Sequence, residues 1–555
     1  MSTFQEKTSL IMKTADILRG VFKPEEYDKI ILPMVLLKRF DSVLEDVKDE
    51  ILEEAEDLKD APDKEGSLKD LFGQVINDSK FNFKKLEEDH EHIKENFKAY
   101  INGYSSNVKN IIRAFNFEAS IDKLHKHNLL YEIIRNFNQI DFHPDVVSNS
   151  EMGAIFEQLI RLFSENALAG DHYTPREVIA LMTELVLIGD EERLKESVAI
   201  DSYDPTCGTN GINSVFQEKI KEKNLNLKVY VYGQEINEQS HAIGQADLLL
   251  RGEDESNIKQ GNTLTNDQFP NETFNYIMAN PPYGITWKAF QKEIADEHKQ
   301  KGFSGRFGAG LPRTSDGSLL FVQHMISKMK PNDSKVAVVL NGSPLFTGDA
   351  GSGESDIRKW ILENDLLEGI VALPTDLFFN TGIATYIWIL NNHKPEHRKG
   401  KVQLINAVDF FEKMAKSMGN KRKIISPEQI QEIRDMYEKF EENKFSKIYD
   451  NEFFGYRKVE VRRTSDKKWK DTEQIPIQED VQVYMEREVL PHIEDAYIDE
   501  SKTKIGYEIN FTRYFYEYKP LRKSSDILSE FLQIQEDNEK LMKELFSTDL
   551  GGDSQ

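Results

Sequence analysis

The segment VAIDSYDPTCGTNG, residues 198–211, decides the expected fold. Its start predicts a strand at residues 198–202, and the stretch from Ile212 to Ile220 is a plausible helix. A glycine-containing turn between a strand and a helix lets backbone N–H groups approach a ligand closely and points a helix N-terminus at an anionic group. The segment therefore predicts a strand, loop and helix of an α/β domain, with a ligand at the loop.

Short β-rich runs alternate with longer amphipathic stretches through the centre of the chain, which is typical of a parallel sheet covered by helices. This pattern predicts a doubly wound α/β domain, in which ligands bind at the carboxyl ends of the strands. Further strands are expected at residues 227–232, 274–278, 335–340, 367–373 and 385–390.

Asn280-Pro281-Pro282-Tyr283 directly follows the expected strand at 274–278. An exocyclic amino group on a nucleobase is a poor nucleophile because its lone pair is delocalised into the ring. Acceptors that hold both amino hydrogens favour a pyramidal nitrogen, and an aromatic ring can stack on a base that has left its duplex. The motif therefore indicates methylation of a base amino group. Alone, a Pro-Pro pair is more often a rigid turn, so the neighbouring motifs must decide.

Other motifs lie where a cofactor would be held. Glu235 follows the second strand, where an acidic side chain commonly accepts hydrogen bonds from ribose hydroxyls. Asn262, within residues 261–264, can read an adenine edge through its amide, although a polar turn explains it equally well. Thr174 as N-cap and Pro175 at the first helical position predict a helix start. Glu235 and Asn262 therefore favour one ligand pocket at the strand ends, whereas Thr174 and Pro175 by themselves indicate only helix capping.

The flanking regions differ from this centre. Residues 1–148 carry apolar side chains near helical spacing and predict a helical domain. The α/β domain is placed at residues 149–475, and a helical region for subunit docking at residues 476–555. An amphipathic helix from Asp526 onward packs either on its own domain or on another subunit. A basic stretch at residues 457–470 favours contact with phosphates or an acidic partner, or else a solvated loop.

The stretch after the Pro-Pro motif, residues 284–317, is long and rich in glycine and polar residues. Loops of more than about 12 to 15 residues without structure are commonly functional or disordered. Arg306, Phe307 and Arg313 are therefore candidates for contact with DNA beside a displaced base. A flexible solvent loop is the alternative.

Composition limits the possible functions. A formal net charge of −25 over 555 residues is wrong for a chain that holds DNA by itself, because nonspecific affinity comes from Lys and Arg on phosphates. The single cysteine, Cys207, excludes intrachain disulfides and a cysteine-rich metal site. The start lacks a signal-peptide pattern, and no apolar run is long enough to span a bilayer. We expect a soluble intracellular protein and, if DNA is its substrate, a partner that supplies much of the affinity for DNA.

The motifs occur in a fixed order, which is Tyr173-Thr174-Pro175, Asp204 to Gly211, Glu235, Gly261 to Leu264, and Asn280 to Tyr283. This order resembles the amino-group DNA methyltransferases that use S-adenosylmethionine, and more closely the modification subunit of type I restriction-modification systems. The likeness continues through Lys38-Arg39-Phe40 near the N-terminus and Phe454-Gly455-Tyr456-Arg457 toward the C-terminus. It covers nearly the whole chain, and the joint order and spacing are much more specific than any single motif.

The resemblance implies a Rossmann-like S-adenosylmethionine-dependent methyltransferase core with an N-terminal all-α domain and a C-terminal helical extension. Asn280 and the Pro281 carbonyl would accept the two amino hydrogens, and Tyr283 would stack on the flipped base. No metal is expected. The implied catalytic residues are Asn280, Pro281, Pro282 and Tyr283, and the implied cofactor-binding residues are Tyr173, Thr174, Pro175, Asp204, Thr206, Gly208, Thr209, Gly211, Glu235, Asn262, Thr263 and Leu264.

Two positions depart from the family pattern. Asn210 stands where glycine is usual, and Asn262 stands where aspartate is usual. Asparagine tolerates left-handed backbone angles better than most residues, so Asn210 can preserve the turn. Asn262 still donates and accepts but lacks the charge that strengthens a hydrogen bond to an adenine amino group, which leaves weak cofactor affinity open.

The resemblance also implies the reaction and the partners. The expected reaction is methyl transfer to N6 of a flipped adenine in double-stranded DNA, in the cytoplasm of a bacterial or archaeal cell. The expected partners are a DNA specificity subunit, a second copy of this subunit and a restriction subunit, with no membrane. Transfer to cytosine N4, to RNA or to a protein glutamine remains an alternative, as does a catalytically weak cofactor-binding scaffold for a DNA-reading partner.

Overall fold

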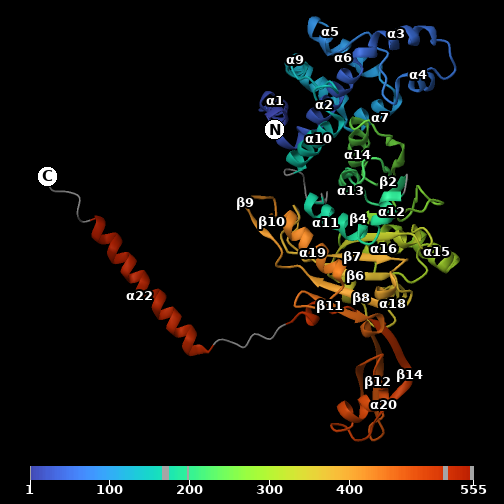
Figure 1. Cartoon of the computed structure of the whole chain (residues 1–555), viewed down its shortest axis with the longest axis vertical. Coiled ribbons are helices and arrows are strands. Elements are labelled where there is room, and N and C mark those ends of the chain that lie inside the picture. Colours follow the sequence, from blue (N-terminus) through green and yellow to red (C-terminus); the bar gives the residue numbers. More distant parts are fainter. Residues whose placement is uncertain (1, 165–173, 197–198, 380, 517–522, 550–555) are drawn as a thin grey trace. The chain divides into compact units, whose positions relative to one another are not determined.

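The computed structural model describes residues 2–164, 174–196, 199–379, 381–516 and 523–549. The chain divides into two compact units, Met1–Asn510 and Phe511–Gln555. Figure 1 shows the elements of each unit. None of the helices that the structure describes combines the length and the apolarity of a membrane-crossing segment.

The N-terminal region is helical, as predicted. Apolar side chains from its helices form one buried cluster, in which Phe40, Phe97 and Tyr100 are at most 2 % exposed. The helices are α1 Ser2–Leu18, α2 Asp28–Val43, α3 Lys48–Asp57, α4 Lys64–Phe72, α5 Phe83–Glu88, α6 Ile93–Asn102, α7 Ser106–Ala114, α8 Phe117–Lys126, α9 Leu130–Asn138 and α10 Asn149–Ser164.

One helix of the α/β core, α14 (Glu238–Leu250), also belongs to the N-terminal cluster. It packs against α2, α7 and α10 and contributes Ile243, Ala246 and Leu249 to their apolar core. On its other side it contacts the strand region that precedes it, so it lies between the N-terminal helices and the sheet (Figure 1). The two regions are therefore joined by continuous apolar packing rather than by a linker alone.

The α/β core contains a nine-stranded sheet in the order β11-β8-β6-β7-β5-β4-β1-β2-β3. Strands β1, β2, β3, β4 and β5 pair in parallel, whereas β7 runs antiparallel to both of its neighbours, β5 and β6. The strand order reverses beside β1, which is where doubly wound sheets open a ligand crevice. The strands are β1 Ala199–Asp204, β2 Lys228–Glu235, β3 Ile258–Gln260, β4 Tyr276–Ala279, β5 Lys335–Asn341, β6 Leu367–Ala372, β7 Thr385–Asn391, β8 Lys401–Asn406 and β11 Ser446–Asp450.

All six expected strands are present, with small shifts at their ends. Strand β4 starts two residues later than predicted, because Phe274 forms only an isolated bridge to Met329. Every side chain of β4 is at most 1 % exposed, so both faces of this strand are covered. The covering elements include α11 Arg176–Leu187, α13 Gly211–Lys223, α16 Ser318–Ser327 and α19 Pro427–Lys439, with α12 Glu191–Glu196, α15 Gln291–Lys301, α17 Ser343–Phe346 and α18 Gly353–Glu363 completing the helices of the core.

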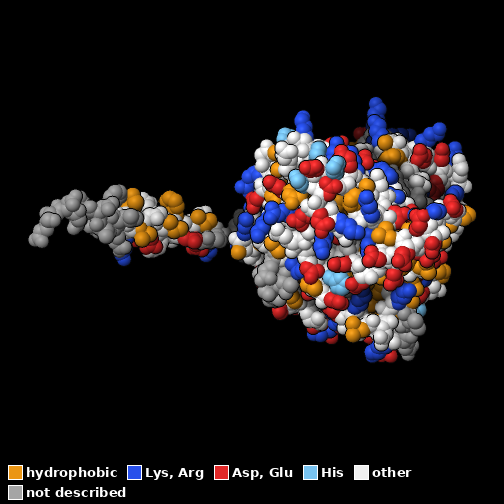
Figure 2. Space-filling view, turned by 90° about the horizontal axis from the view of Figure 1, so that it is seen from above, with side chains coloured by type: hydrophobic (Ala, Val, Ile, Leu, Met, Phe, Trp, Pro, Cys, Tyr) orange, Lys and Arg blue, Asp and Glu red, His pale blue; other side chains and the backbone are white. Residues whose placement is uncertain are grey.

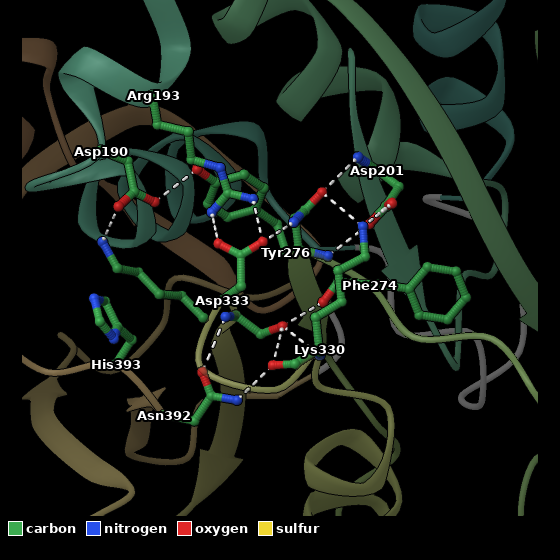
Figure 3. A network of polar contacts seen from close by, with 12 residues as sticks. Asp190, Arg193, Asp201, Phe274, Tyr276, Lys330, Asp333, Asn392 and His393 are labelled. Carbon is green, nitrogen blue, oxygen red and sulfur yellow. Dashed lines mark hydrogen bonds and ion pairs between the residues drawn. The ribbon is translucent and has the colours of Figure 1, made fainter. Parts of the chain in front are cut away.

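A polar network fixes the first residues of β4 and β5 (Figure 3). Tyr276 and Lys335 are register partners in adjacent strands, and both contact Asp190. The Tyr276 hydroxyl donates to Asp190 Oδ2 at 2.6 Å, and Lys335 Nζ lies 2.9 Å from Asp190 Oδ1. Burial and the Asp190 charge raise the pKa of Tyr276 well above its ordinary value, so the hydroxyl stays a donor. One carboxylate thus ties two strands to the segment after α11.

The C-terminal part of the first unit corrects one expectation. Residues 476–555 were predicted to be helical, but β14 (Ala496–Tyr507) is a strand. It pairs antiparallel with β12 (Gly455–Arg463), which also pairs with β13 (Lys470–Pro476). The apolar spacing that marked a helix begins only near residue 524, and β14 instead completes a small core with β12. The remaining elements are a hairpin of β9 Glu412–Met418 and β10 Lys421–Ile424, and the helices α20 Val481–Tyr484, α21 Phe511–Tyr514 and α22 Ser524–Asp549.

The predicted basic stretch lies on this small sheet, where acidic neighbours pair with much of it. Arg462 is 2.5 Å from Glu460, and Arg463 is 2.9 Å from Asp495. The expected helical extension in the second unit is α22, where described apolar side chains such as Phe531 and Leu541 are more than half exposed.

Asp190→Ala is expected to destabilise the protein by about 3 kcal/mol, because it leaves Lys335 as a largely buried charge without its carboxylate. Urea unfolding followed by tryptophan fluorescence measures the change. Glu192→Ala is the matched control, since it removes an exposed pair with Lys195 and should change the unfolding free energy by less than about 0.5 kcal/mol. Equal shifts in both variants would contradict a structural role for the network.

Candidate functional site

A chamber of about 950 Å³ opens at the carboxyl ends of β1, β2 and β4. Its volume is within the range of pockets that enclose cofactor-sized ligands. Pro175, Pro281 and Tyr283 are not part of its lining, and Tyr173 lies outside the described residues. The predicted site residues that line it are Thr174, Asp204, Thr206, Gly208, Thr209, Gly211, Glu235, Asn262, Thr263, Leu264, Asn280 and Pro282.

The loop after β1 turns its backbone toward this chamber. Gly208 (φ 53°) and Asn210 (φ 68°) both adopt left-handed conformations. A Cβ atom at Gly208 would meet nothing within 4 Å, so the backbone there faces open space. The buried Asn210 side chain accepts a hydrogen bond from Asn213 Nδ2 at 2.9 Å. Asparagine therefore keeps the turn at a position where glycine is usual, as expected.

Asp204, the last residue of β1, presents an unpaired acceptor. Its Oδ1 accepts from the Thr206 backbone N–H at 2.9 Å, while the buried Oδ2 has no hydrogen-bond partner among the described residues. Burial and, to a smaller extent, the nearby Glu235 carboxylate raise the pKa of the Asp204 carboxyl to about 8, although the hydrogen bond from the Thr206 N–H lowers it. Buried polar atoms are rarely left unpaired, so the site fits a ligand that brings a donor to Asp204.

Glu235 connects the first two strand ends. Its Oε2 accepts from the Gly208 N–H at 2.9 Å, and its Oε1 accepts from the Asn237 N–H at 2.7 Å. Each carboxylate oxygen can accept a second hydrogen bond, so hydroxyl donors of a ligand can still be bound. Glu235 therefore holds the β1 loop in place and remains able to accept from a ribose.

The turn at Asn262 is held from behind by Arg306. Asn262 Oδ1 accepts from the Leu264 N–H at 3.0 Å, which shapes the turn. The Arg306 guanidinium donates to the carbonyls of Thr263 at 2.7 Å and Leu264 at 2.9 Å, and it pairs with Glu297 at 2.6 Å. The expectation that Arg306 contacts DNA is therefore wrong, because its donors are used inside the protein.

Residues 284–317 also differ from the expected loop without structure. They contain α15, and Phe307 is fully buried in a cluster with Leu264 and Trp287. Arg313 is about half exposed and donates to Ser343 Oγ at 2.9 Å. The stretch is thus a packed support for the Asn262 turn, and only Arg313 of the three candidates stays available to a large ligand.

Asn280, the first residue after β4, is 6 % exposed and is held at both ends of its amide. Its Nδ2 donates to Thr174 Oγ1 at 3.0 Å, and its Oδ1 accepts from the Tyr283 hydroxyl at 2.6 Å. The Tyr283 ring packs edge-on against Phe378, with centroids 6.3 Å apart, and burial raises the pKa of its phenol above the ordinary value. A stacking role for Tyr283 therefore requires the ring to move when a base enters.

The expectation that Thr174 caps a helix is wrong. Helix α11 begins at Arg176, and its N-cap position is Pro175, without a side-chain cap. Thr174 does not cap the helix, because its hydroxyl instead receives the Asn280 amide, 106 positions away in the chain. Local sequence carries no signal for a contact of this range.

The chamber also includes residues that sequence reasoning missed. Asp28 and Lys29, at the start of α2, line it together with Gln239 of α14. Gln239 Nε2 donates to Asp28 Oδ2 at 2.9 Å. More than 170 residues separate Asp28 from the β1 loop, so only the shared packing of α14 brings them together. Within the described ranges, no cluster of His, Cys, Asp and Glu is suited to a metal ion.

Family models match most of the chain. Residues 147–459 match the model described as N-6 DNA Methylase, and residues 8–137 match the model described as HsdM N-terminal domain. A type I restriction enzyme methylase subunit (MjaIX) of Methanocaldococcus jannaschii is 28 % identical over 342 residues, which are 61 % of this chain and 57 % of that protein. The HindI methylase subunit of Haemophilus influenzae is 30 % identical over 261 residues, or 46 % and 54 %. The chain thus spans just over half the length of these curated relatives.

Solved structures show the same fold. A type I restriction-modification methyltransferase subunit from Streptococcus thermophilus has a TM-score of 0.64 at 23 % identity, covering 81 % of this chain and 97 % of that one. A modification subunit of a putative type I restriction enzyme from Vibrio vulnificus has a TM-score of 0.55 at 16 % identity, covering 88 % and 98 %. At such identities the likeness supports the fold.

Asp204→Asn tests the raised pKa of this carboxyl. Between its ordinary value of 3.8 and about 8, the folded protein holds a proton that the unfolded chain has lost, so wild-type stability falls as pH rises through this range. The amide does not titrate. Without added ligand, the Tm of the variant minus that of wild type should therefore grow from pH 5 to pH 8 and then level off, as measured by differential scanning fluorimetry. A difference independent of pH would contradict the raised pKa.

Arg306→Ala is expected to weaken binding of S-adenosylmethionine, the cofactor that the family resemblance implies, by about tenfold, because the Thr263 and Leu264 carbonyls lose their donor and the Asn262 turn loosens. Isothermal titration calorimetry measures the Kd. Arg313→Ala is the matched control, since its guanidinium contacts Ser343 rather than the turn, and its Kd should stay within twofold. Wild-type affinity in Arg306→Ala would show that the turn does not depend on this residue.

Proposed function

We propose a function from one premise, that this chain belongs to the N-6 DNA methylase family, whose model matches more than half of its 555 residues. The chain transfers a methyl group from S-adenosylmethionine to N6 of adenine in DNA, as the modification subunit of a type I restriction-modification complex. The observation that carries this proposal is the position of Asn280, at the end of β4 and in one chamber with Asp204 and Glu235.

The residues of the chamber fit the cofactor that this family uses. When bound, S-adenosylmethionine supplies an electrophilic methyl group on a positively charged sulfur. The unpaired Oδ2 of Asp204 suits a donor of the methionine part, Glu235 suits the ribose hydroxyls, and the Asn262 turn suits the adenine. The Glu235 carboxylate also favours a ligand that carries positive charge, and such a ligand would lower the raised pKa of the Asp204 carboxyl.

The chain's own groups then hold the target. Asn280 Oδ1 and the Pro281 carbonyl accept the two amino hydrogens, which favours a pyramidal nitrogen with an available lone pair. The buried position of β4 fixes the Asn280 backbone, so the rate comes from placement of acceptors rather than from a strong base. The amino nitrogen becomes acidic on methylation and releases its proton to solvent.

The partners follow from charge and from one exposed apolar surface. Acidic and basic side chains are interspersed on the face seen in Figure 2, and the net charge is −25, so another subunit supplies most of the grip on DNA. Hydrophobic side chains along α22 are exposed (Figure 2), which supports docking of this helix on another subunit. The assembly contains a DNA specificity subunit, a second copy of this chain and a restriction subunit.

We assign a separate role in this function to each of three regions of the chain. Residues 1–148 form the helical domain that borders the cofactor chamber, residues 149–475 carry the methyltransferase site, and residues 476–555 serve docking.

A cofactor-binding scaffold is the second candidate function. Two observations favour it. Asn262 lacks the charge that is usual at its position, and the Asn280 Oδ1 acceptor already accepts a hydrogen bond from the Tyr283 hydroxyl. Binding of S-adenosylmethionine without any transfer by the complete complex would favour the scaffold over the enzyme.

Asn280→Ala is expected to retain S-adenosylmethionine binding within twofold but to lower methyl transfer by about 100- to 1000-fold, because it removes an acceptor aimed at the reacting amino group. The complex is purified from its own cells and mixed with tritiated cofactor and DNA from a strain that lacks this gene. Counting and nucleoside analysis then identify N6-methyladenine, N4-methylcytosine or no product.

Asn226→Ala, which changes an exposed asparagine outside the chamber, is the control and should transfer at the wild-type rate. Undiminished transfer by Asn280→Ala would overturn the assignment of the catalytic residue.

A further inference from the structure

The amide of Asn280 lies between two hydroxyl groups of different character. Thr174 Oγ1 is 3.0 Å from its nitrogen, and the Tyr283 hydroxyl is 2.6 Å from its oxygen. Thr174 is 8 % exposed and Asn280 is 6 % exposed, so water competes little for these contacts. Both ends of a side chain that must act as an acceptor are thus already bonded before any substrate enters.

The orientation of this amide decides whether the site can work. Its oxygen and nitrogen ends are nearly equal in shape, and a rotated amide would present an NH₂ group to the NH₂ group of the target base. Two donors facing each other leave both unpaired in a buried site, which is strongly unfavourable. Something other than shape must therefore hold the oxygen end toward the substrate.

The two hydroxyls favour only one orientation. A phenol is a better donor and a weaker acceptor than an aliphatic hydroxyl, because its oxygen lone pair is delocalised into the ring. Tyr283 therefore bonds best to the amide oxygen, and Thr174 accepts best from the amide nitrogen. This is the arrangement seen, with Thr174 on Nδ2 and Tyr283 on Oδ1.

The backbone around Thr174 makes it a firm support. Pro175 follows it at the N-cap of α11 with φ −60°, and proline fixes this angle. Helix α11 is anchored by Val178, Met182 and Leu185, which are at most 1 % exposed in the core under the sheet. The Thr174 hydroxyl is thus carried by a rigid element, whereas Tyr283 lies on the loop beyond the Pro-Pro pair.

We propose that Thr174 is a positioning residue, which orients the Asn280 amide, and that the Tyr283 hydroxyl holds the place on Oδ1 that the target amino group later takes. The inference rests on the proposed function, since it concerns an amino-group acceptor. Entry of the base exchanges one hydrogen bond to Oδ1 for another, while the bond to Thr174 remains. The acceptor therefore stays aligned through the exchange, and no buried amide atom is left without a partner.

Thr174→Val is the test, because valine keeps the shape and removes the hydroxyl. With the complete complex, tritiated S-adenosylmethionine and DNA from a strain lacking this gene, the single-turnover rate at saturating cofactor and DNA should fall by about 10- to 100-fold. The calorimetric Kd for S-adenosylmethionine and the Tm should stay close to wild type. Thr174→Ser, which restores a hydroxyl, should recover most of the rate.

Thr183→Val is the matched control on the same helix. Thr183 is fully buried, and its hydroxyl has no hydrogen-bond partner among the described residues, so the same substitution should leave the rate unchanged. Tyr283→Phe tests the second half of the proposal. It keeps the ring but frees Oδ1, so the KM for DNA should fall a few-fold.

Each outcome separates the inference from the function on which it rests. A wild-type complex that transfers no methyl group overturns the proposed function, and the inference falls with it. Transfer by wild type to another acceptor, such as RNA, overturns the DNA substrate of the proposed function, and the Thr174→Val rate on that acceptor then supports or overturns the positioning role. A Thr174→Val rate equal to wild type, or a loss explained wholly by weaker cofactor binding, overturns the positioning role. An unchanged or raised KM in Tyr283→Phe overturns the place-holding role of Tyr283.

Discussion

Complete burial of strand β4 is the constraint on which the site depends. Its four side chains are sealed on both faces, and its first residue is tied to β5 through Asp190. A strand fixed in this way has no freedom to slide, because a shift of one residue would exchange its two faces. Asn280 is the first position at which the chain leaves the sheet, so the place of the acceptor amide is set by packing rather than by the loop itself.

The chamber is formed by the loops that follow the strands, and a side chain from another element forms hydrogen bonds to each of them. Glu235 on β2 holds the loop after β1, Arg306 holds the turn after β3, and Thr174 holds Asn280 after β4. These contacts share a design in which a polar side chain bonds to the backbone or amide of the next element. Two buried acceptors of chamber residues, Asp204 Oδ2 and Asp28 Oδ1, have no hydrogen-bond partner among the described residues, so both suit a ligand that brings a donor.

Much of the central fold could be predicted, because the six expected strands carry apolar runs. These runs are densest in β4, β5, β6 and β7, which are largely buried on both faces. Strand β3 spans three residues, and β8 and β11 occur in a polar, charged region, so local pattern gave no clear signal. The reversed direction of β7 depends on pairing with β5 and β6, which local pattern does not encode. In the site, the order of the motifs predicted that the chamber residues lie together. The partners of Thr174, Arg306 and Tyr283 could not be predicted, because they are set by tertiary contacts rather than by local spacing.

Helix α14 connects the N-terminal helices to the chamber. The helix starts directly after the Glu235 loop, and its far side is part of the apolar core built by α2, α7 and α10. Removing the N-terminal helices would expose Ile243, Ala246 and Leu249 to water and remove the packing that holds the helix directly after the Glu235 loop. The first part of the chain therefore lines the chamber through Asp28 and Lys29, and a truncated core that retains every motif would lack this side of the chamber.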